Sequence, residues 1–112
     1  MTECLFCRIV EGKVPSERVH EDDDVIVIRD IYPKAPVHLL VIPRIHCESL
    51  NELTPANDRL IAHMVRLLPG LARSQGLDSG FRTVINTGRG GGQEIFHLHI
   101  HLLGGAGRLP GF

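Results

Sequence analysis

The sequence predicts an α+β fold, a mainly antiparallel sheet of about five strands with two helices on one side of it. Two observations carry this prediction. Apolar segments with strand character recur at residues 25–30, 37–43, 81–88 and 94–103. Segments with helical periodicity lie at residues 4–12 and 54–76. No repeat or linker divides the 112 residues, so we expect one domain over residues 1–112.

The segment "CLFCRIVEG" at residues 4–12 has the apolar spacing of a short helix. Leu5, Phe6 and Ile9 follow the i, i+1, i+4 pattern, so their side chains share one face. Gly12 is placed to end this helix, because glycine readily adopts the left-handed conformation that follows a helical C-terminus.

Two apolar strands follow an acidic turn. The run "EDDD" at residues 21–24 predicts a solvated turn. The segments "VIVIRD" (25–30) and "VHLLVIP" (37–43) are rich in the β-branched residues that strands favour. Pro43 stops the second strand, because proline has no N–H to donate to a neighbouring strand.

The longest helix is predicted over residues 54–76. Thr54 provides the N-cap and Pro55 the first helical residue, where a missing N–H is not needed. Pro69 should kink or interrupt the helix, and Gly76 should end it. One apolar face is expected to pack on the sheet, formed by Leu60, Ile61, Met64, Leu68 and Leu71.

The segment "EIFHLHIHLL" (94–103) alternates strictly between apolar residues and histidine. A period of two is the side-chain period of a strand, whereas residues two apart on a helix lie on nearly opposite sides. The strand should therefore present His97, His99 and His101 on one face, with neighbouring imidazoles about 6.6 Å apart. The other face should bury Phe96, Leu98, Ile100 and Leu102 in the core.

Three neighbouring imidazoles disfavour one another's protonation, so neutral rings should be available near pH 7. Such rings can bind a metal, transfer protons or attack an electrophile such as phosphorus, and the spacing alone does not choose among these. The preceding segment "NTGRGGGQ" (86–93) is by itself equally a flexible hairpin connection. Its four glycines would let the backbone approach a phosphate closely. Next to three histidines, the loop predicts a phosphate pocket.

The composition argues against several classes of protein. Apolar residues make up 43% of the chain, which suits a globular protein, and the net charge of −1 gives no reason to expect nucleic acid or a membrane as a partner. No apolar run approaches the roughly 18 residues of a membrane span. The N-terminus lacks a secretory-signal pattern, and three cysteines do not suggest a disulfide framework. We therefore expect a cytoplasmic protein.

Three blocks of the sequence resemble the histidine triad (HIT) superfamily. The block "GGQEIFHLHIHLLGG" (91–105) is similar to its signature, in which three histidines alternate with apolar residues. Upstream, "DIYPKAPVHLLVIPRIH" (30–46) and "CRIVEGKVPSERVHEDDDVIVIRD" (7–30) resemble two further blocks, in the family's order. Gly104 and Gly105 resemble the Hint branch of histidine triad nucleotide-binding proteins. The Fhit branch usually has a proline–arginine pair there.

The resemblance implies a hydrolase that cleaves purine nucleoside 5′-phosphoramidates or related adenylated compounds at the α-phosphate. The middle histidine, His99, would attack the phosphorus to form a covalent nucleotidyl-histidine, which water then hydrolyses. His101 and Gln93 would donate hydrogen bonds to non-bridging phosphate oxygens. His38 would support the orientation of the imidazoles from behind.

By the same resemblance, Asp30 would accept both ribose hydroxyls, a pairing that suits a carboxylate. Asn86 would lie near the ribose and phosphate, and Gly92 belongs to the phosphate loop. Glu94 stands where animal Hint proteins usually have serine; it would act as a general acid for the leaving group or merely face solvent. The purine would lie among apolar side chains that ordinary core packing explains equally well: Leu5, Phe6, Ile9, Ile28 and Ile31.

Cys4 and Cys7 form a C-x-x-C pair, which alone suits a redox dithiol or a zinc site. Some bacterial HIT proteins, and the related galactose-1-phosphate uridylyltransferases, hold zinc with two such cysteines and two histidines. The matching positions here are Cys4, Cys7, His46 and His97, with Cys47 a bystander. Two thiolates and two imidazoles make a closed set typical of structural zinc.

The resemblance also implies a two-fold homodimer whose sheets join edge to edge into one continuous sheet, helped by the long helix. The short tail "AGRLPGF" corresponds to a segment that in Hint dimers can reach the partner's site. Three alternatives to a phosphoramidase stay open: a Fhit-like dinucleoside polyphosphate hydrolase, a hydrolase with catalytic zinc on His97, His99 and His101, and a nucleotide-binding regulatory protein with little turnover.

Overall fold

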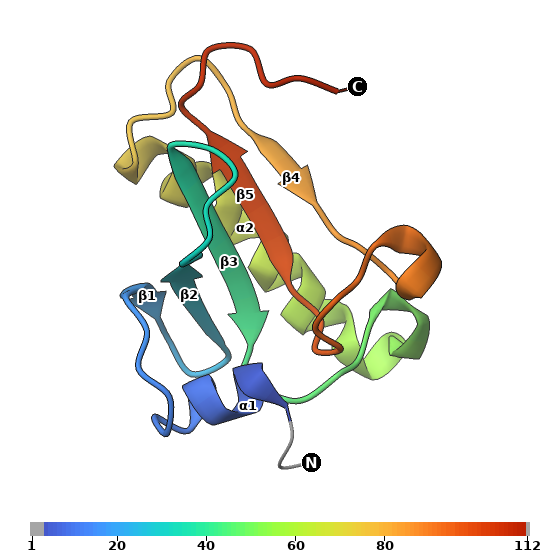
Figure 1. Ribbon diagram of the computed structural model, residues 1–112. Coiled ribbons are helices and arrows are strands. Elements are labelled where there is room, and N and C mark those ends of the chain that lie inside the picture. Colours follow the sequence, from blue (N-terminus) through green and yellow to red (C-terminus); the bar gives the residue numbers. More distant parts are fainter. Residues whose placement is uncertain (1–3, 112) are drawn as a thin grey trace.

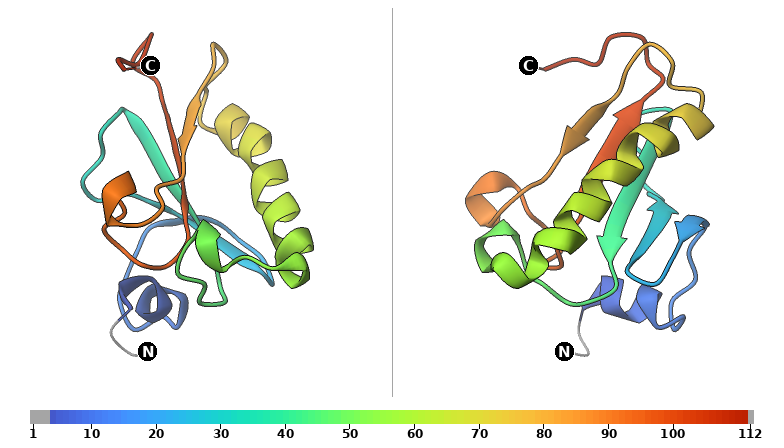
Figure 2. Two further views of the ribbon diagram at one scale, coloured as in Figure 1. Left: turned by 90° about the vertical axis from the view of Figure 1, so that its right-hand side faces the viewer. Right: turned by 180° about the vertical axis from the view of Figure 1, so that it is seen from behind.

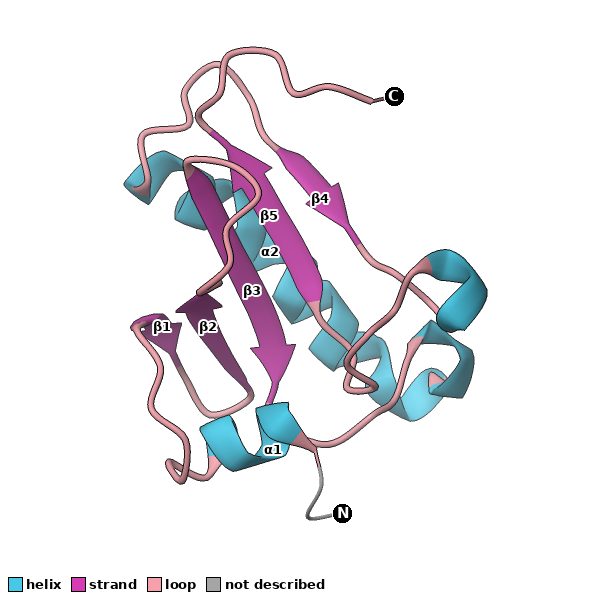
Figure 3. Cartoon of the chain, viewed as in Figure 1, coloured by secondary structure: helices cyan, strands magenta, loops and turns pink. Residues whose placement is uncertain are grey.

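The computed structural model describes residues 4–111, and its centre is a five-stranded antiparallel sheet with the strand order β1-β2-β3-β5-β4 (Figure 1). The strands are β1 (Arg18–Glu21), β2 (Val25–Arg29), β3 (Val37–Pro43), β4 (Arg82–Val84) and β5 (Ile100–Gly104). Two α-helices, α1 (Leu5–Val10) and α2 (Asp58–Ser74), accompany three short 3-10 helices, η1 (Leu50–Glu52), η2 (Pro55–Asn57) and η3 (Arg89–Gly91) (Figure 3). The predicted α+β fold class is confirmed. No helix within residues 4–111 is long and apolar enough to cross a membrane.

The two helices cover opposite faces of the sheet, so the prediction that they share one side is wrong (Figure 2). Beneath α2 the strands bury Val25, Val27, Leu39, Val41, Ile100 and Leu102. Beneath α1 the alternate residues pack with Phe6 and Ile9, namely Ile26, Ile28, Leu40 and Ile42. Strands β2 and β3 are buried on both faces, which is why they read as continuous apolar runs. Such a run does not indicate which face a helix covers.

Helix α2 runs from Asp58 to Ser74 with Pro69 inside it, so of the predicted kink or interruption the interruption is wrong. The proline is exposed, whereas Leu68, Leu71 and Ala72 on either side of it are buried against the sheet. Packing of these neighbours against the sheet therefore keeps the helix continuous through the proline. Thr54 caps the short helix η2 rather than α2, with a capping box to Asn57.

The histidine strand is shorter than predicted, because β5 begins at Ile100 and residues 94–99 are irregular. This segment is bound to the loop after β3 instead of to a neighbouring strand, with the Leu98 N–H donating to the Cys47 carbonyl at 2.7 Å. Leu98 is buried as predicted, but Phe96 is 38% exposed. The short edge strand β1 was not predicted at all, since Val19 is its one large apolar residue.

The turn between β1 and β2 is tied to α2 through the carboxylate of Asp22. Its Oδ1 accepts from the N–H groups of Asp24 and Val25, both at 2.9 Å. Its Oδ2 lies 2.8 Å from Nε2 of both His20 and His63. Burial alone would raise the pKa of Asp22, but these hydrogen bonds hold it well below its ordinary range.

Asp22→Asn should lower the free energy of unfolding at pH 7 by roughly 1–2 kcal/mol, because two imidazoles lose a charged acceptor. A carboxyl whose pKa is lowered by folding stabilises the fold above its ordinary pKa of about 4, and this contribution is lost as the pH falls. In urea unfolding the deficit should therefore be largest near pH 7 and shrink below about pH 4. The exposed neighbour Asp23→Asn is the matched control. A deficit that is equal at both ends of the pH range would contradict this account.

Candidate active site

A cavity of about 490 Å³ opens beside α1, on the face of the sheet that this helix covers. The strand register brings its walls together. His101 on β5 pairs with Leu40 on β3 and with Val84 on β4, and Leu103 pairs with His38 and Arg82 in the same way. Eight residues that the sequence assigned to catalysis or substrate binding line this cavity: Phe6, Asp30, His38, Asn86, Gly92, Glu94, His99 and His101.

His99 lies at the cavity with its imidazole held in one tautomer. Its Nδ1 is 2.7 Å from the backbone carbonyl of His97. A carbonyl can only accept, so Nδ1 carries the proton and Nε2 keeps a free lone pair. The ring is 8% exposed and packs edge-on against Phe6. Burial lowers the pKa of His99, so the neutral ring, the nucleophilic form, is present near pH 7.

His101 is held in the opposite tautomer by a hydrogen-bonded chain. The backbone N–H of Lys34 donates to Nδ1 of His38 at 3.1 Å, so the proton of His38 is on Nε2. Nε2 of His38 lies 2.9 Å from Nδ1 of His101 and donates to it. Because Nδ1 of His101 accepts this hydrogen bond, the proton of His101 is on Nε2. Burial, with the neighbouring His99 and His38, lowers the pKa of His101 to about 4. One imidazole thus offers a lone pair at Nε2 and its neighbour offers an N–H.

The hydrogen bonds from Lys34 to His38 and from His38 to His101 argue against a metal ion at the cavity. Asp30, His38 and His101 have potential ligand atoms within 4.8 Å of one another. His38, however, accepts a hydrogen bond at Nδ1 and carries its proton on Nε2, so it has no lone pair left for a metal. Nor do His97, His99 and His101 form a common ligand set within residues 4–111. The geometry favours a proton-carrying network over catalytic zinc on the histidine row.

Gln93 and most of the glycine loop do not line the cavity, although both were predicted to contact a phosphate there. Gln93 is 4% exposed, does not line the cavity, and donates from Nε2 to two backbone carbonyls. Of the four loop glycines, Gly92 alone lines the cavity. It has a φ of +89°, and a Cβ there would lie 4.0 Å from the Asn86 side chain. The predicted donation from Gln93 to a phosphate is not supported by this arrangement.

Of the five apolar residues predicted to surround the purine, the structure places only one at the cavity. Phe6 lines the cavity, whereas Ile9 and Ile28 are buried in the core beneath α1. Ile31 is 80% exposed and Leu5 is 43% exposed, and neither lines the cavity. The sequence reasoning did not identify several lining residues, namely Tyr32, Lys34, Leu40, Arg82, Val84, Ile95, Leu103, Leu109 and Pro110. Leu40 and Val84 had a signal, because each is two residues from a predicted site residue on an extended segment.

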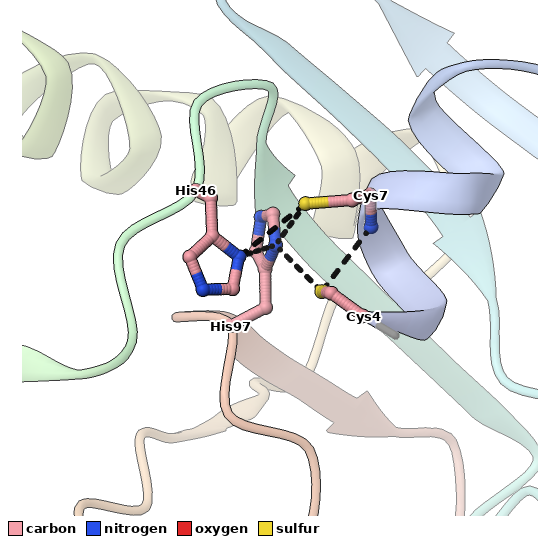
Figure 4. Close-up of side chains that lie close together, drawn as sticks. All are labelled: Cys4, Cys7, His46 and His97. Carbon is pink, nitrogen blue, oxygen red and sulfur yellow. Dashed lines mark hydrogen bonds between the residues drawn. The ribbon is translucent and has the colours of Figure 1, made fainter. Parts of the chain in front are cut away.

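Cys4, Cys7, His46 and His97 converge beside the N-terminus of α1 (Figure 4). The Sγ of Cys4 and Nδ1 of His97 are 3.3 Å apart, as are the Sγ of Cys7 and Nδ1 of His46. Nδ1 of His97 is also 3.6 Å from the Sγ of Cys7 and 3.2 Å from Nδ1 of His46. Ligand atoms around tetrahedral zinc would be roughly 3.3–3.8 Å apart. The four side chains therefore fit a zinc ion.

The protonation of this cluster also suits a cation. Nε2 of the fully buried His97 donates to the carbonyl of Pro43 at 2.8 Å, which leaves the Nδ1 lone pair facing the other three ligand atoms. Burial, followed by the neighbouring Cys4 thiol, raises the pKa of Cys7 to about 11. The thiolate of Cys7 is therefore favourable here only with a positive ion beside it. The carbonyl of His97 is the group that fixes the tautomer of His99, so the two sites share one residue.

Comparisons with known proteins agree over nearly the whole chain. Residues 3–111 match the family model described as scavenger mRNA decapping enzyme C-term binding. The purine nucleoside phosphoramidase of Escherichia coli strain K12 is 38% identical over 104 residues, 92% of this chain and 87% of that protein. A 14 kDa zinc-binding protein of Brassica juncea is 43% identical over 106 residues, 92% of this chain and 93% of that protein. The crystal structure of a HIT family hydrolase from Legionella pneumophila Philadelphia 1 is similar with a TM-score of 0.90 and 42% identity, covering 96% of this chain and 95% of that one.

Proposed function

Because the chain belongs to the histidine triad (HIT) family of hydrolases, we propose that it cleaves purine nucleoside 5′-phosphoramidates or related adenylated compounds at the α-phosphate. One observation carries this proposal: two adjacent imidazoles at one cavity are held in opposite tautomers. Nε2 of His99 has a lone pair for phosphorus, and Nε2 of His101 has a proton for a phosphate oxygen. A nucleophile beside a hydrogen-bond donor is what transfer through a covalent intermediate needs.

The reaction proceeds in two displacements at the same phosphorus. Nε2 of His99 attacks the α-phosphorus, the bond from phosphorus to the leaving amine breaks, and the amine departs with a proton from Glu94 or solvent. His101 donates its Nε2 proton as a hydrogen bond to a non-bridging oxygen, on which charge develops. Water then attacks the phosphorus of the nucleotidyl-His99 and gives one proton to Glu94 or solvent, the N–P bond breaks, and the nucleoside monophosphate leaves. His99 returns to its neutral form, ready for the next substrate.

The remaining residues of the cavity hold the nucleotide. Asp30 accepts the ribose hydroxyls; its Oδ1 is oriented by the Tyr32 N–H at 2.8 Å. Asn86 and Gly92 lie next to the phosphate. The purine packs against the apolar part of the lining, which includes Phe6 and Leu40. Shape and burial fix the base in such a pocket, so we expect modest selectivity between purines.

We propose that Cys4, Cys7, His46 and His97 hold a structural zinc ion. Bound there, zinc would supply the positive charge that keeps both thiols ionised. The cysteines come from the N-terminal end of α1, and the histidines come from the loop after β3 and the segment before β5. The protein residues themselves carry out the transfer, and this ligand set ties the helix to the start of the histidine segment.

We further propose a cytoplasmic homodimer in which the β4 edges of two copies pair. Strand β4 is an edge strand with one neighbour in the sheet. Phe81, directly before β4, is an exposed apolar side chain. Joining two such edges would extend the sheet across the two-fold axis and cover this side chain.

Turnover of matched substrates tests the proposed activity. We expect kcat/KM for an AMP phosphoramidate of a simple amine to exceed that for a diadenosine polyphosphate by at least about tenfold. The opposite preference would favour the Fhit-like alternative. Binding of AMP with no turnover of either substrate would favour a regulatory nucleotide-binding protein and would overturn the proposal.

A further inference from the structure

The buried side chain of Gln93 joins three separate pieces of backbone. Its Nε2 donates to the carbonyl of Glu48 at 2.7 Å and to that of Ile95 at 3.1 Å. Its Oε1 accepts from the N–H of Gly88 at 2.9 Å. Both N–H groups and the carbonyl of the carboxamide are therefore engaged with the protein, and no donor is left for a phosphate.

The three pieces of backbone lie in the glycine loop, in the cavity lining and in the loop after β3. Gly88 begins the glycine loop, and its own carbonyl accepts from the N–H groups of Gly91 and Gln93 at 3.1 and 3.0 Å. Ile95 lines the cavity. Glu48 follows β3, in the loop that also carries His46. The carboxamide thus connects the glycine loop to the loop after β3 and to the cavity residue Ile95.

The residues on either side of Gln93 face the cavity. Gly92 and Glu94 both line it, while the Gln93 side chain points away into the protein. Asn86, which Gly92 adjoins, lines the same wall. A shift of the Gln93 backbone would therefore move this wall relative to His99, which also lines the cavity.

We propose that Gln93 is a positioning residue, which holds the cavity wall of Asn86, Gly92 and Glu94 at the spacing that a nucleotide phosphate requires without touching the substrate. The identity of the ligand rests on the proposed function. Without the carboxamide, the carbonyls of Glu48 and Ile95 would lose the donor that they share, and each would have to replace it with water. The two segments that carry these carbonyls would then no longer be held to each other or to Gly88. The wall would then loosen before any substrate binds.

Gln93→Met and Gln93→Glu test this role. Methionine keeps the length of the side chain but makes none of the three hydrogen bonds; glutamate keeps the acceptor for Gly88 and loses the amide donors. For both variants we expect KM and the Kd of AMP to rise roughly tenfold with kcat within about threefold, as expected when binding common to ground and transition states is lost. Amide hydrogen exchange of residues 86–96 in the ligand-free variants should become at least about tenfold faster. Gln75→Met is the matched control, because Gln75 at the end of α2 makes a single side-chain hydrogen bond, from Arg29.

The outcomes separate the possible roles of Gln93. Weaker AMP binding with unchanged hydrogen exchange in the ligand-free protein would mean direct contact with the phosphate, and would overturn the proposal. A lower melting temperature with unchanged KM, AMP binding and local exchange would also overturn it, since the role would then be in stability alone. If Gln93→Met does not fold, Gln93→Glu carries the same two readouts. Wild-type protein that binds AMP but turns over no phosphoramidate would refute the proposed activity and leave the exchange and binding results for Gln93 valid.

Discussion

His99→Asn should lower kcat for an AMP phosphoramidate by at least about four orders of magnitude while leaving the Kd of AMP within about threefold. The size of the effect follows from loss of the nucleophile, which no neighbouring group can replace. His101 has its Nδ1 occupied by His38, and its Nε2 carries a proton. Asparagine retains much of the shape of the ring, so the cavity and its affinity for a nucleotide should persist. Single-turnover kinetics and calorimetric titration with AMP measure the two quantities.

The matched control for this variant is His63→Asn, the same change on α2, which covers the opposite face of the sheet. It should leave kcat within about twofold of the wild type. Residual turnover of the His99 variant at a tenth of the wild-type rate would mean that another group attacks the phosphorus. Loss of AMP binding together with turnover would mean that the substitution damaged the cavity.

The double substitution Cys4→Ser/Cys7→Ser should abolish zinc binding and produce the largest loss of stability. Wild-type protein is expected to contain about one zinc ion per chain and the variant almost none. A ligand at a thousand times its Kd stabilises the folded state by about 4 kcal/mol, so a loss of this order is expected at saturating zinc. Elemental analysis and urea unfolding measure both effects. Because the His97 carbonyl holds Nδ1 of His99, kcat should fall as well, by roughly tenfold.

Cys47→Ser is the control for the cysteine variant. Cys47 lies outside the ligand set, with its Sγ 3.5 Å from the carbonyl of Ser49. This variant should keep its zinc and unfold within about 1 kcal/mol of the wild type. Removal of zinc from the wild type by a chelator should reproduce the instability of the double variant, and added zinc should reverse it. Unchanged zinc content in the double variant would refute the metal site.

The histidine row was predictable because side-chain direction on an extended segment depends only on local backbone geometry. The alternation predicted His97, His99 and His101 on one face and Phe96, Leu98, Ile100 and Leu102 in the core. The structure agrees for Leu98, Ile100 and Leu102 and brings His99 and His101 together, but Phe96 is exposed. The alternation did not reveal that the strand begins only at Ile100. The segment before it is bound by the Leu98 N–H to the loop after β3 and by the His97 ring to the last residue of β3, both far away in sequence.

The direction of Gln93 could not be read from the sequence for a similar reason. A glutamine beside a glycine loop suits phosphate binding and backbone bonding equally well, and its partners Glu48 and Gly88 are known only once the loops are packed. The sequence also did not indicate which face of the sheet each helix covers, because β2 and β3 are apolar on both faces. By contrast, the convergence of Cys4, Cys7, His46 and His97, expected from the family resemblance, is present in the structure.

Mass spectrometry of the protein during turnover of an AMP phosphoramidate tests the central claim most directly. After rapid acid-free quenching and proteolysis, the peptide that contains residues 97–101 should carry one adenylyl group, with fragmentation placing it on His99. The label should be absent from His99→Asn. An adenylyl group on His101 or on any other residue, or turnover with no labelled peptide at any time, would contradict the account.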